Sequence, residues 1–130
     1  MWAAMRPLKG KFMKTVQTFT ASIYVGFRVR YSEKLHSIEE VRDWIKIYCN
    51  ETGFCVTITP LEFIYTHSPA SGCVGYEPGC VIGIINYPRF PSTPQELKDR
   101  CLVIAVGLQK LCEQGKVSVV FPDETVMLGE

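Results

Sequence analysis

Hydrophobic and polar residues alternate strictly over the segment from Phe19 to Tyr31. One set of positions is apolar throughout: Phe19, Ala21, Ile23, Val25, Phe27, Val29 and Tyr31. Successive side chains of a β-strand point to opposite faces of the sheet. A period of two therefore predicts a long strand with one buried face.

The period changes to that of a helix after Ser37. Ser37 and Glu40 form the S-x-x-E capping box that precedes helices, so we expect a helix from Ile38. Its buried stripe has the spacing of one helix face: Ile38, Val41, Ile45, Tyr48 and Cys49. Gly53 predicts the end of this helix, because glycine readily adopts the left-handed conformation that closes one.

Two further strands are predicted after this helix. Apolar residues alternate in FCVTITP until Pro60 interrupts the pattern, and EFIYT resumes an extended segment. HSPASGCVGYEPG is predicted to be a loop from its Gly, Pro and Ser content. CVIGIINY, which begins at Cys80, is apolar on both faces, as is typical of a central strand covered on both sides.

A second helix and two short strands complete the chain. Thr93 and Glu96 form another capping box, with Pro94 at the first helical position. The apolar stripe of this helix ends at Gly115 and comprises Leu97, Cys101, Ile104, Ala105, Leu108, Leu111 and Cys112. KVSVVF is predicted as the last core strand, and PDET turns the chain into a terminal strand, VML.

The order of elements is therefore β-α-β-β-α-β with a final hairpin. This order predicts an α+β ferredoxin-like fold: a four-stranded antiparallel sheet with both helices on one face. Residues 1–12 lack a clear period, so we expect a flexible N-terminal extension there. Residues 13–130 are then a single ligand-binding domain, long enough to bury one core.

The strand beginning at Cys80 has a consequence for assembly. One face of a ferredoxin-like sheet is bare, so a monomer would expose Val81, Ile85 and Tyr87 as an apolar patch. We expect a second subunit to cover this patch. The assembly is predicted to be a dimer or a multiple of a dimer, with an interface above about 1,000 Å².

Composition and charge exclude several partners. A net charge of +1 gives no broad positive field of the kind that duplex-binding proteins use, so we predict no DNA partner. The chain has no secretory signal and no long apolar run, which indicates a cytoplasmic protein without a membrane partner. Its six cysteines are then reduced thiols.

Recognisable catalytic and metal-binding motifs are missing. A structural zinc site requires paired ligands at short spacing, and His36 and His67 have no such partners, so we expect neither a metal nor another cofactor. A G-x-S-x-G elbow, a phosphate-binding Walker loop and an H-E-x-x-H helix are all missing. On these grounds the sequence predicts a protein that is not an enzyme.

Binding chemistry is concentrated at the end of the third core strand, in GIINYPRFPSTPQEL. Asn86 can donate to and accept from a base edge or a ribose hydroxyl. Tyr87 and Phe90 offer stacking surfaces, and the Arg89 guanidinium can pair with phosphate. The prolines reduce the entropy lost on ligand binding. The alternative is that Asn86 caps the strand and Phe90 packs under the second helix.

Further candidate ligand-binding residues come from other elements. Tyr24 and Arg28 lie on the polar face of the first strand, and Tyr76 lies in the Gly-rich loop. Arg100 is near the start of the second helix, where the helix dipole favours anions. Solvation, an intersubunit salt bridge or an exposed loop tyrosine would explain the same residues. Together they fit a small ligand that carries bases and phosphates.

Three segments, FTASIYVGFRVRYSEKLHSIEEV, CVTITPLEFIYT and GIINYPRFP, resemble the phage-encoded Thoeris anti-defence proteins of the first type. The resemblance spans about Met13 to Leu128. It implies capture, without cleavage, of a cyclised ADP-ribose immune signal in the infected bacterium, and of cyclic oligonucleotides by some members. The family forms dimers that can assemble into hexamers. Asn86 and Tyr76 match its pocket by position, with Arg28 and Arg100 as further matches.

Two other protein classes share the predicted topology. One is an oligomeric small-effector sensor similar to the PII and CutA proteins. The other is an RNA-recognition-motif module, although the third core strand lacks the K/R-G-F-x-F pattern whose aromatic residues stack on bases. RNA binding would depend strongly on salt, whereas a signal-sequestering protein would bind small cyclic nucleotides at a fixed ratio per subunit.

Overall fold

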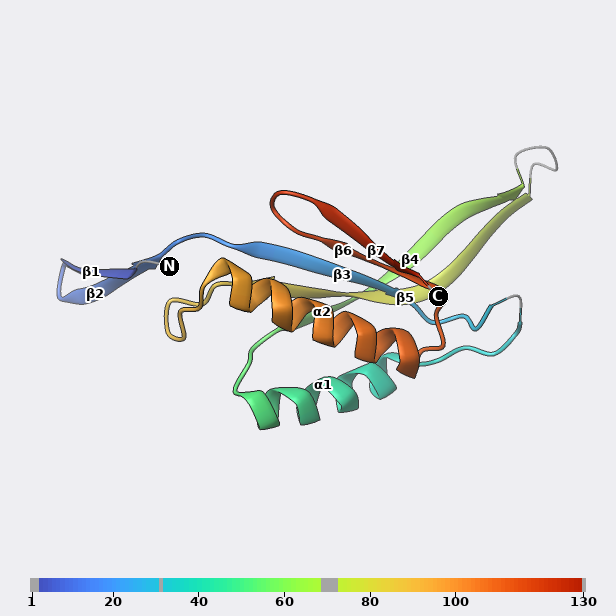
Figure 1. Ribbon diagram of the computed structural model, residues 1–130, viewed down its shortest axis with the longest axis horizontal. Helices are drawn as coiled ribbons and strands as arrows, with labels where there is room; N and C mark the ends of the chain where they lie inside the picture. The colour runs from blue at the N-terminus through green and yellow to red at the C-terminus, as the bar shows by residue number, and fades with distance from the viewer. Residues whose placement is uncertain (1–2, 31, 69–72, 130) are drawn as a thin grey trace.

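A computed structural model of the chain describes residues 3–30, 32–68 and 73–129. Within these ranges the chain forms seven strands and two helices (Figure 1). In chain order they are β1 (Ala3–Leu8), β2 (Lys11–Val16), β3 (Thr20–Gly26), α1 (Ile38–Thr52), β4 (Thr57–Ser68), β5 (Cys73–Ile85), α2 (Pro94–Leu111), β6 (Lys116–Val120) and β7 (Thr125–Gly129).

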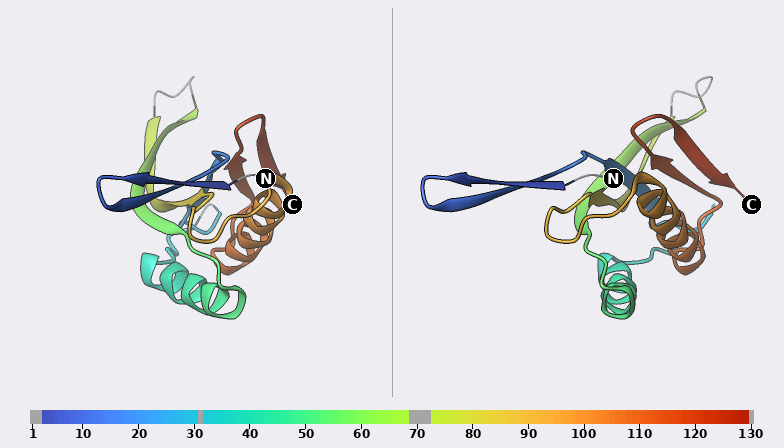
Figure 2. Two further views of the ribbon diagram at one scale, coloured as in Figure 1. Left: turned by 90° about the vertical axis from the view of Figure 1, so that its left-hand side faces the viewer. Right: turned by 60° about the vertical axis from the view of Figure 1, so that its left-hand side comes forward.

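The main sheet has five antiparallel strands in the order β4-β5-β3-β6-β7. Both helices cover the same face of this sheet, and the other face is open (Figure 2). The first four strands of this order, from β4 to β6, have the arrangement of a ferredoxin-like fold, and β7 adds a fifth strand at the edge through its pairing with β6. The predicted fold class is confirmed.

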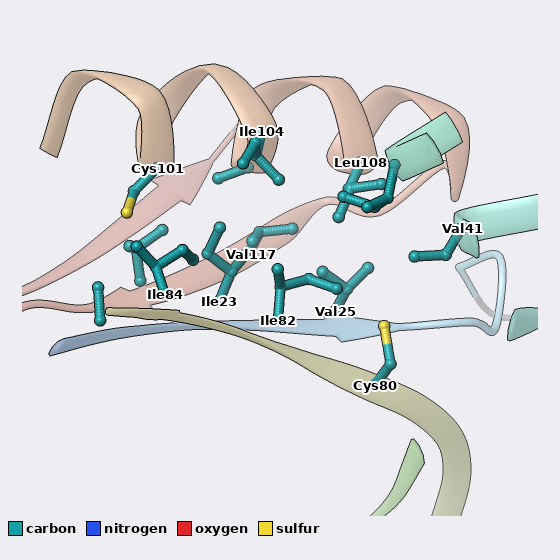
Figure 3. Packing of buried hydrophobic residues seen from close by; sticks show 14 of the residues in the cluster. Ile23, Val25, Val41, Cys80, Ile82, Ile84, Cys101, Ile104, Leu108 and Val117 are labelled. Carbon is teal, nitrogen blue, oxygen red and sulfur yellow. The ribbon is translucent and has the colours of Figure 1, made fainter. Parts of the chain in front are cut away.

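The core lies between the sheet and the two helices (Figure 3). Alternate residues of β3 and β5 face the helices, including Ile23, Val25, Ile82 and Ile84. The stripe of α2 packs over them through Cys101, Ile104 and Leu108, all of which are fully buried. Each large aliphatic side chain buried in this way contributes about 1.5–3 kcal/mol to folding.

Both helices begin where local sequence signals place them, and α1 also ends there, whereas α2 ends at Leu111, before the predicted Gly115. The Ser37 backbone N–H donates to Glu40 Oε2 over 2.7 Å, and the Glu40 N–H donates back to Ser37 Oγ over 3.3 Å. Gly53 closes α1 with a φ of 73°, and its N–H donates to the Cys49 carbonyl. Thr93 caps α2 by accepting from the Glu96 N–H. Local hydrogen bonds therefore fix the helix boundaries.

The β4–β5 hairpin is longer than the sequence pattern indicates. The segment from His67 to Gly79 was predicted as a loop, but β5 already begins at Cys73, and the two strands pair as far as Ser68 and Cys73. Pro60 lies inside β4, which is compatible with pairing because β4 is an edge strand. The hairpin extends beyond the helices (Figure 1).

The first core strand is shorter than predicted. β3 ends at Gly26 rather than at Tyr31, which lies outside the described residues. The Phe27 N–H donates to the Pro78 carbonyl, and Arg28 pairs with Leu35 in an isolated bridge. The chain therefore leaves the sheet at Gly26 and turns towards α1.

Residues 3–16 form a second, two-stranded sheet, which contains most of the segment predicted as a flexible extension, residues 1–12; the division into extension and domain stays a prediction. Pairing runs from Ala3 opposite Val16 to Leu8 opposite Lys11. Lys9 and Gly10 have positive φ angles of 45° and 77°, as in the tight turns that suit a two-residue hairpin connection. The predicted domain boundary at residue 13 thus lies inside β2. The hairpin projects from the body of the molecule (Figure 1).

The open face of the main sheet carries apolar side chains. Tyr24, Ile85, Val120 and Met127 are all more than a third exposed. Val81 is half-buried on the same face. The expected dimer interface stays a prediction. None of the described helices is both long and apolar enough to cross a membrane.

Candidate functional site

A pocket of about 220 Å³ lies where β5 ends and α2 begins. We call it the strand-end pocket. Three of the predicted ligand-binding residues, Tyr87, Phe90 and Arg100, line it. The remaining lining residues are Thr52, Gly53, Phe54, Cys55, Ile85, Pro91, Ser92 and Leu97. The structure thus brings part of the predicted set together, at the position where the sequence concentrates it.

The electrostatics of the strand-end pocket favour anions. None of its lining residues is acidic, and the Arg100 guanidinium lies 5.1 Å from the centre of the Phe54 ring. Arg89 stacks in the same way over Phe90, at 5.2 Å. A hydrogen bond with the Cys55 thiol, together with burial, raises the pKa of Tyr87 above its ordinary value.

Asn86 lies beside this pocket and makes internal hydrogen bonds at both ends of its amide. Its Nδ2 donates to the Gln17 carbonyl over 2.8 Å, and its Oδ1 accepts from the Ser92 N–H over 3.0 Å. The side chain is only 6% exposed. This geometry supports the alternative reading, in which Asn86 fixes the end of the strand. A role in ligand binding has not been tested and stays a prediction.

The other predicted residues do not line the strand-end pocket. Tyr24 is 38% exposed on the open face of β3, and Tyr76 is 64% exposed on β5 rather than in a loop. Arg28 follows the end of β3, and its Nη1 donates to the Ser32 carbonyl over 3.3 Å. The sequence therefore grouped residues that the fold distributes over two ends of the sheet.

A second polar site lies at the base of the β4–β5 hairpin, on the open face of the sheet. We call Gly26, Phe63, Glu77 and Gln114 the Glu77 cluster. A Cβ atom on Gly26 would lie 2.8 Å from Glu77 Oε2 and 2.9 Å from Gln114 Oε1. Two acceptor oxygens therefore share the space above this glycine. They favour a hydrogen-bond donor or a cation there.

The surroundings of the Glu77 cluster hold its side chains in place. Gln114 is 8% exposed and donates from Nε2 to the carbonyls of Arg28 and Cys112. Glu77 Oε2 accepts from the Arg28 N–H over 2.9 Å. Phe63 of β4 is paired with Glu77 of β5. The Phe63 ring covers Gly79, because a Cβ atom added to Gly79 would lie 2.6 Å from Phe63 Cε2.

Sequence reasoning missed the Glu77 cluster. Glu77 fell in a segment predicted to be a loop, and Gln114 lies between α2 and β6, where no motif marks it. Only the pairing of β3 with β5 brings Gly26 next to Gly79 and thereby places Glu77 over Gly26. No local signal in the sequence could have found this contact.

His36 is also in a more distinctive setting than its sequence neighbours indicate. Its Nδ1 lies 3.0 Å from Glu40 Oε1, and its Nε2 lies 3.0 Å from Glu113 Oε1. Glu113 also pairs with Lys34 over 2.8 Å. Hydrogen bonds to Lys34 and His36 lower the pKa of Glu113, and the bond to His36 lowers that of Glu40. No group of described residues could hold a metal ion.

The described cysteines include three that are poor nucleophiles. Burial raises the pKa of Cys80 to about 11, and those of Cys101 and Cys112 to about 12. A thiol with such a pKa has almost no thiolate at neutral pH. These three residues belong to the core, as the sequence predicts for small hydrophobic residues. The side chain of Cys73 lies outside the described residues.

Comparison with known proteins finds likeness in structure alone. No protein-family model matches the chain, and no curated protein sequence matches it. Two solved structures share its fold. A phage SAM lyase in the apo state has a TM-score of 0.66 and 18% sequence identity, over 86% of this chain and 89% of the lyase chain.

The second structure is a phage SAM lyase in complex with S-methyl-5′-thioadenosine. It has a TM-score of 0.68 and 20% identity, over 87% of this chain and 90% of the lyase chain. At such identities the likeness establishes the fold. The prediction that the chain is not an enzyme is contradicted by this comparison, because the shared fold is that of a named lyase. Lack of a recognisable motif was not a valid reason to exclude catalysis.

Proposed function

We propose that the chain is an enzyme that binds S-adenosylmethionine and cleaves it to release S-methyl-5′-thioadenosine. The proposal is supported by the fold shared with phage SAM lyases over most of both chains, one of them with S-methyl-5′-thioadenosine bound. It retains part of the function predicted from sequence, namely binding of a small nucleoside ligand. A phage origin and an anti-defence role extend the same proposal.

The observation that carries the proposal is the pair of oxygens in the Glu77 cluster. S-adenosylmethionine has a positively charged sulfonium sulfur and an ammonium group. Glu77 Oε2 and Gln114 Oε1 meet above Gly26, with the Phe63 ring beside them. A carboxylate and an aromatic ring both attract a cation, so a charged group of the substrate has a suitable position there. The strand-end pocket is unsuitable for a positively charged group, because Arg100 lines it.

The open face of the sheet offers room for the rest of the molecule. Tyr24 lies two residues before Gly26 on the same face of β3, and its ring is more than a third exposed. An adenine base stacks favourably on such a ring, which contributes about 1–3 kcal/mol. Tyr24 was predicted to bind the ligand, and it keeps that role in this proposal.

The chemistry requires one bond to form as another breaks. The carboxylate of the substrate attacks the γ-carbon of its own aminobutyryl chain; as this carbon–oxygen bond forms, the bond from that carbon to the sulfonium sulfur breaks, the sulfur keeps the electron pair, and the aminobutyryl part leaves as homoserine lactone. The nucleoside leaves as the neutral thioether S-methyl-5′-thioadenosine. The Glu77 carboxylate would attract the positive charge of the substrate and so hold the reacting carbon in a fixed position. Positioning of this kind is a large part of catalysis.

Substitution of Glu77 tests the proposal. The purified chain should convert S-adenosylmethionine to S-methyl-5′-thioadenosine, as measured by liquid chromatography. Glu77→Gln keeps the shape of the side chain but removes its charge, and should lower the rate about a hundredfold or more. Glu62→Gln is the matched control. Glu62 belongs to the same hairpin, where it pairs with Pro78, and its side chain lies on the other face of the sheet from Glu77.

Two results would contradict the proposal. One is an unmodified chain that is folded, by circular dichroism, and leaves S-adenosylmethionine intact. The other is an equal loss of rate in Glu62→Gln and Glu77→Gln. Sequestration of cyclic ADP-ribose, which the sequence resemblance implies, stays a prediction that the same preparation tests. Recovery of intact cyclic ADP-ribose from the protein, without turnover of S-adenosylmethionine, would replace the lyase proposal.

A further inference from the structure

The N-terminal hairpin, residues 3–16, concentrates positive charge. We call it the basic hairpin. It contains Arg6, Lys9, Lys11 and Lys14 and no acidic residue. The whole chain has 14 basic and 13 acidic residues, so the part after residue 16 has 10 basic and 13 acidic residues and a net charge of −3. The charge of the molecule is therefore divided between a cationic hairpin and an anionic body.

The basic hairpin also exposes large apolar side chains. Phe12 is 84% exposed, Met5 60% and Leu8 49%. The hairpin projects away from the main sheet and from both helices, as Figure 1 and the right-hand view of Figure 2 show. A two-stranded hairpin in water is marginally stable by itself. If another surface covers the basic hairpin, this contact would stabilise its two paired strands and would bury the exposed Phe12 side chain.

The outer side of the helix pair provides a matching surface. A groove of about 410 Å³ lies between α1 and α2, lined by Trp44, Ile47, Tyr48, Glu51, Thr52 and Val103. We call it the helix groove. Ile47 is 61% exposed and Val103 57%. Glu51 belongs to the groove, and Asp43 and Asp99 lie one helical turn before Ile47 and Val103. The groove is therefore apolar, with an acidic rim that also includes the Arg100 guanidinium beside Tyr48.

We propose that the basic hairpin of one copy of this chain docks in the helix groove of a second copy. Phe12 and Leu8 would enter the apolar groove, and the lysines would pair with its acidic rim. Nucleic acid is a weaker candidate, because phosphates would neutralise the lysines but leave Phe12 exposed. Stable interfaces bury about 1,200–2,000 Å² in total, so we expect each of two reciprocal hairpin contacts to bury about half of that area. The proposal is independent of the proposed enzymatic function.

Photo-crosslinking tests this contact directly. Phe12 is replaced with the photoreactive residue benzoylphenylalanine in the full chain, and light and heavy isotope forms are mixed before irradiation. We expect cross-links between position 12 of one copy and peptides covering residues 44–52 or 99–106 of the other, identified as mixed-isotope pairs. Raising the salt from about 0.05 M to about 0.5 M should reduce their yield, since part of the contact is electrostatic.

Variants of the acceptor copy complete the experiment. Ile47→Glu places a charge in the groove and should lower the yield about tenfold or more. Lys46→Glu is the matched control, because Lys46 is exposed on α1 but does not line the groove. The yield of cross-links between copies should not fall in this variant. The proposal would be overturned if position 12 formed no cross-links. It would also be overturned by cross-links within one copy, to another surface or to bound nucleic acid.

Discussion

Asn86 connects three segments that are far apart in the sequence. Its side chain bonds to Gln17 before β3 and to Ser92 before α2, and its own N–H donates to the Phe19 carbonyl. A buried amide that satisfies two backbone groups is costly to remove, because those groups lose their partners without gaining water. At the scale of one residue, Asn86 is thus placed to stabilise the fold.

We expect Asn86→Ala to lower the free energy of unfolding by about 2 kcal/mol, since a buried backbone group left without a partner costs about 1–3 kcal/mol. Urea denaturation measures this change. Asn50→Ala, at an exposed position of α1, should have almost no effect. If Asn86→Ala were as stable as the unmodified chain and only bound ligand more weakly, its role would be the one predicted from the sequence.

At the scale of elements, the two helices approach each other where Trp44 of α1 meets Gly107 of α2. A Cβ atom on Gly107 would clash with Cζ2 of the Trp44 ring. Trp44 also stacks on Tyr48, with ring centres 5.6 Å apart. Glycine is unfavourable inside a helix, so its presence here is explained by the space that the indole ring requires.

Gly107→Ala should therefore destabilise the chain, although alanine is the better helix former by about 1 kcal/mol. Overpacking of this kind typically costs about 1–3 kcal/mol. Guanidinium denaturation checks the sign, with Val106→Ala as a control at a more exposed position of the same helix. A stabilised Gly107→Ala variant would show that helix propensity outweighs the contact with Trp44.

At the scale of the whole molecule, a group of charged side chains joins the start of α1 to the turn that follows α2: Lys34, His36, Glu40 and Glu113. Their bonds link positions up to 79 residues apart. The pKa values of Glu40 and Glu113 lie below their ordinary value of 4.5 in the folded chain. The unfolded chain consequently takes up protons at a higher pH than the folded chain does. This difference makes global stability depend on pH.

The sign follows from these lowered pKa values. Their stabilising effect is present above the ordinary value of 4.5 and is lost as the pH falls through the folded values. Glu113→Gln should flatten the loss of stability between about pH 5 and about pH 3, measured by urea midpoints. Glu39→Gln is the control, since Glu39 only pairs with Arg42 at 3.9 Å. An unchanged pH profile for Glu113→Gln would contradict this account.

The sequence by itself determined the elements that depend on neighbouring residues. The capping box at Ser37 and the N-cap at Thr93 act over three residues, and Gly53 closes α1 through its own conformation. Alternation in β3 and the stripe of α2 depend only on the periods of strand and helix. These local rules sufficed for the ferredoxin-like order and for three residues of the strand-end pocket.

Tertiary structure alone decided the rest. Gly26 and Gly79 meet only through the pairing of β3 with β5, and this pairing places Glu77 beside Gln114. The Glu113 carboxylate reaches His36 across the ends of both helices. The same holds for Asn86, whose amide appeared free for a ligand until the fold supplied its two partners. A side chain's chemistry is set by the groups within a few ångströms, and those groups come from distant parts of the sequence.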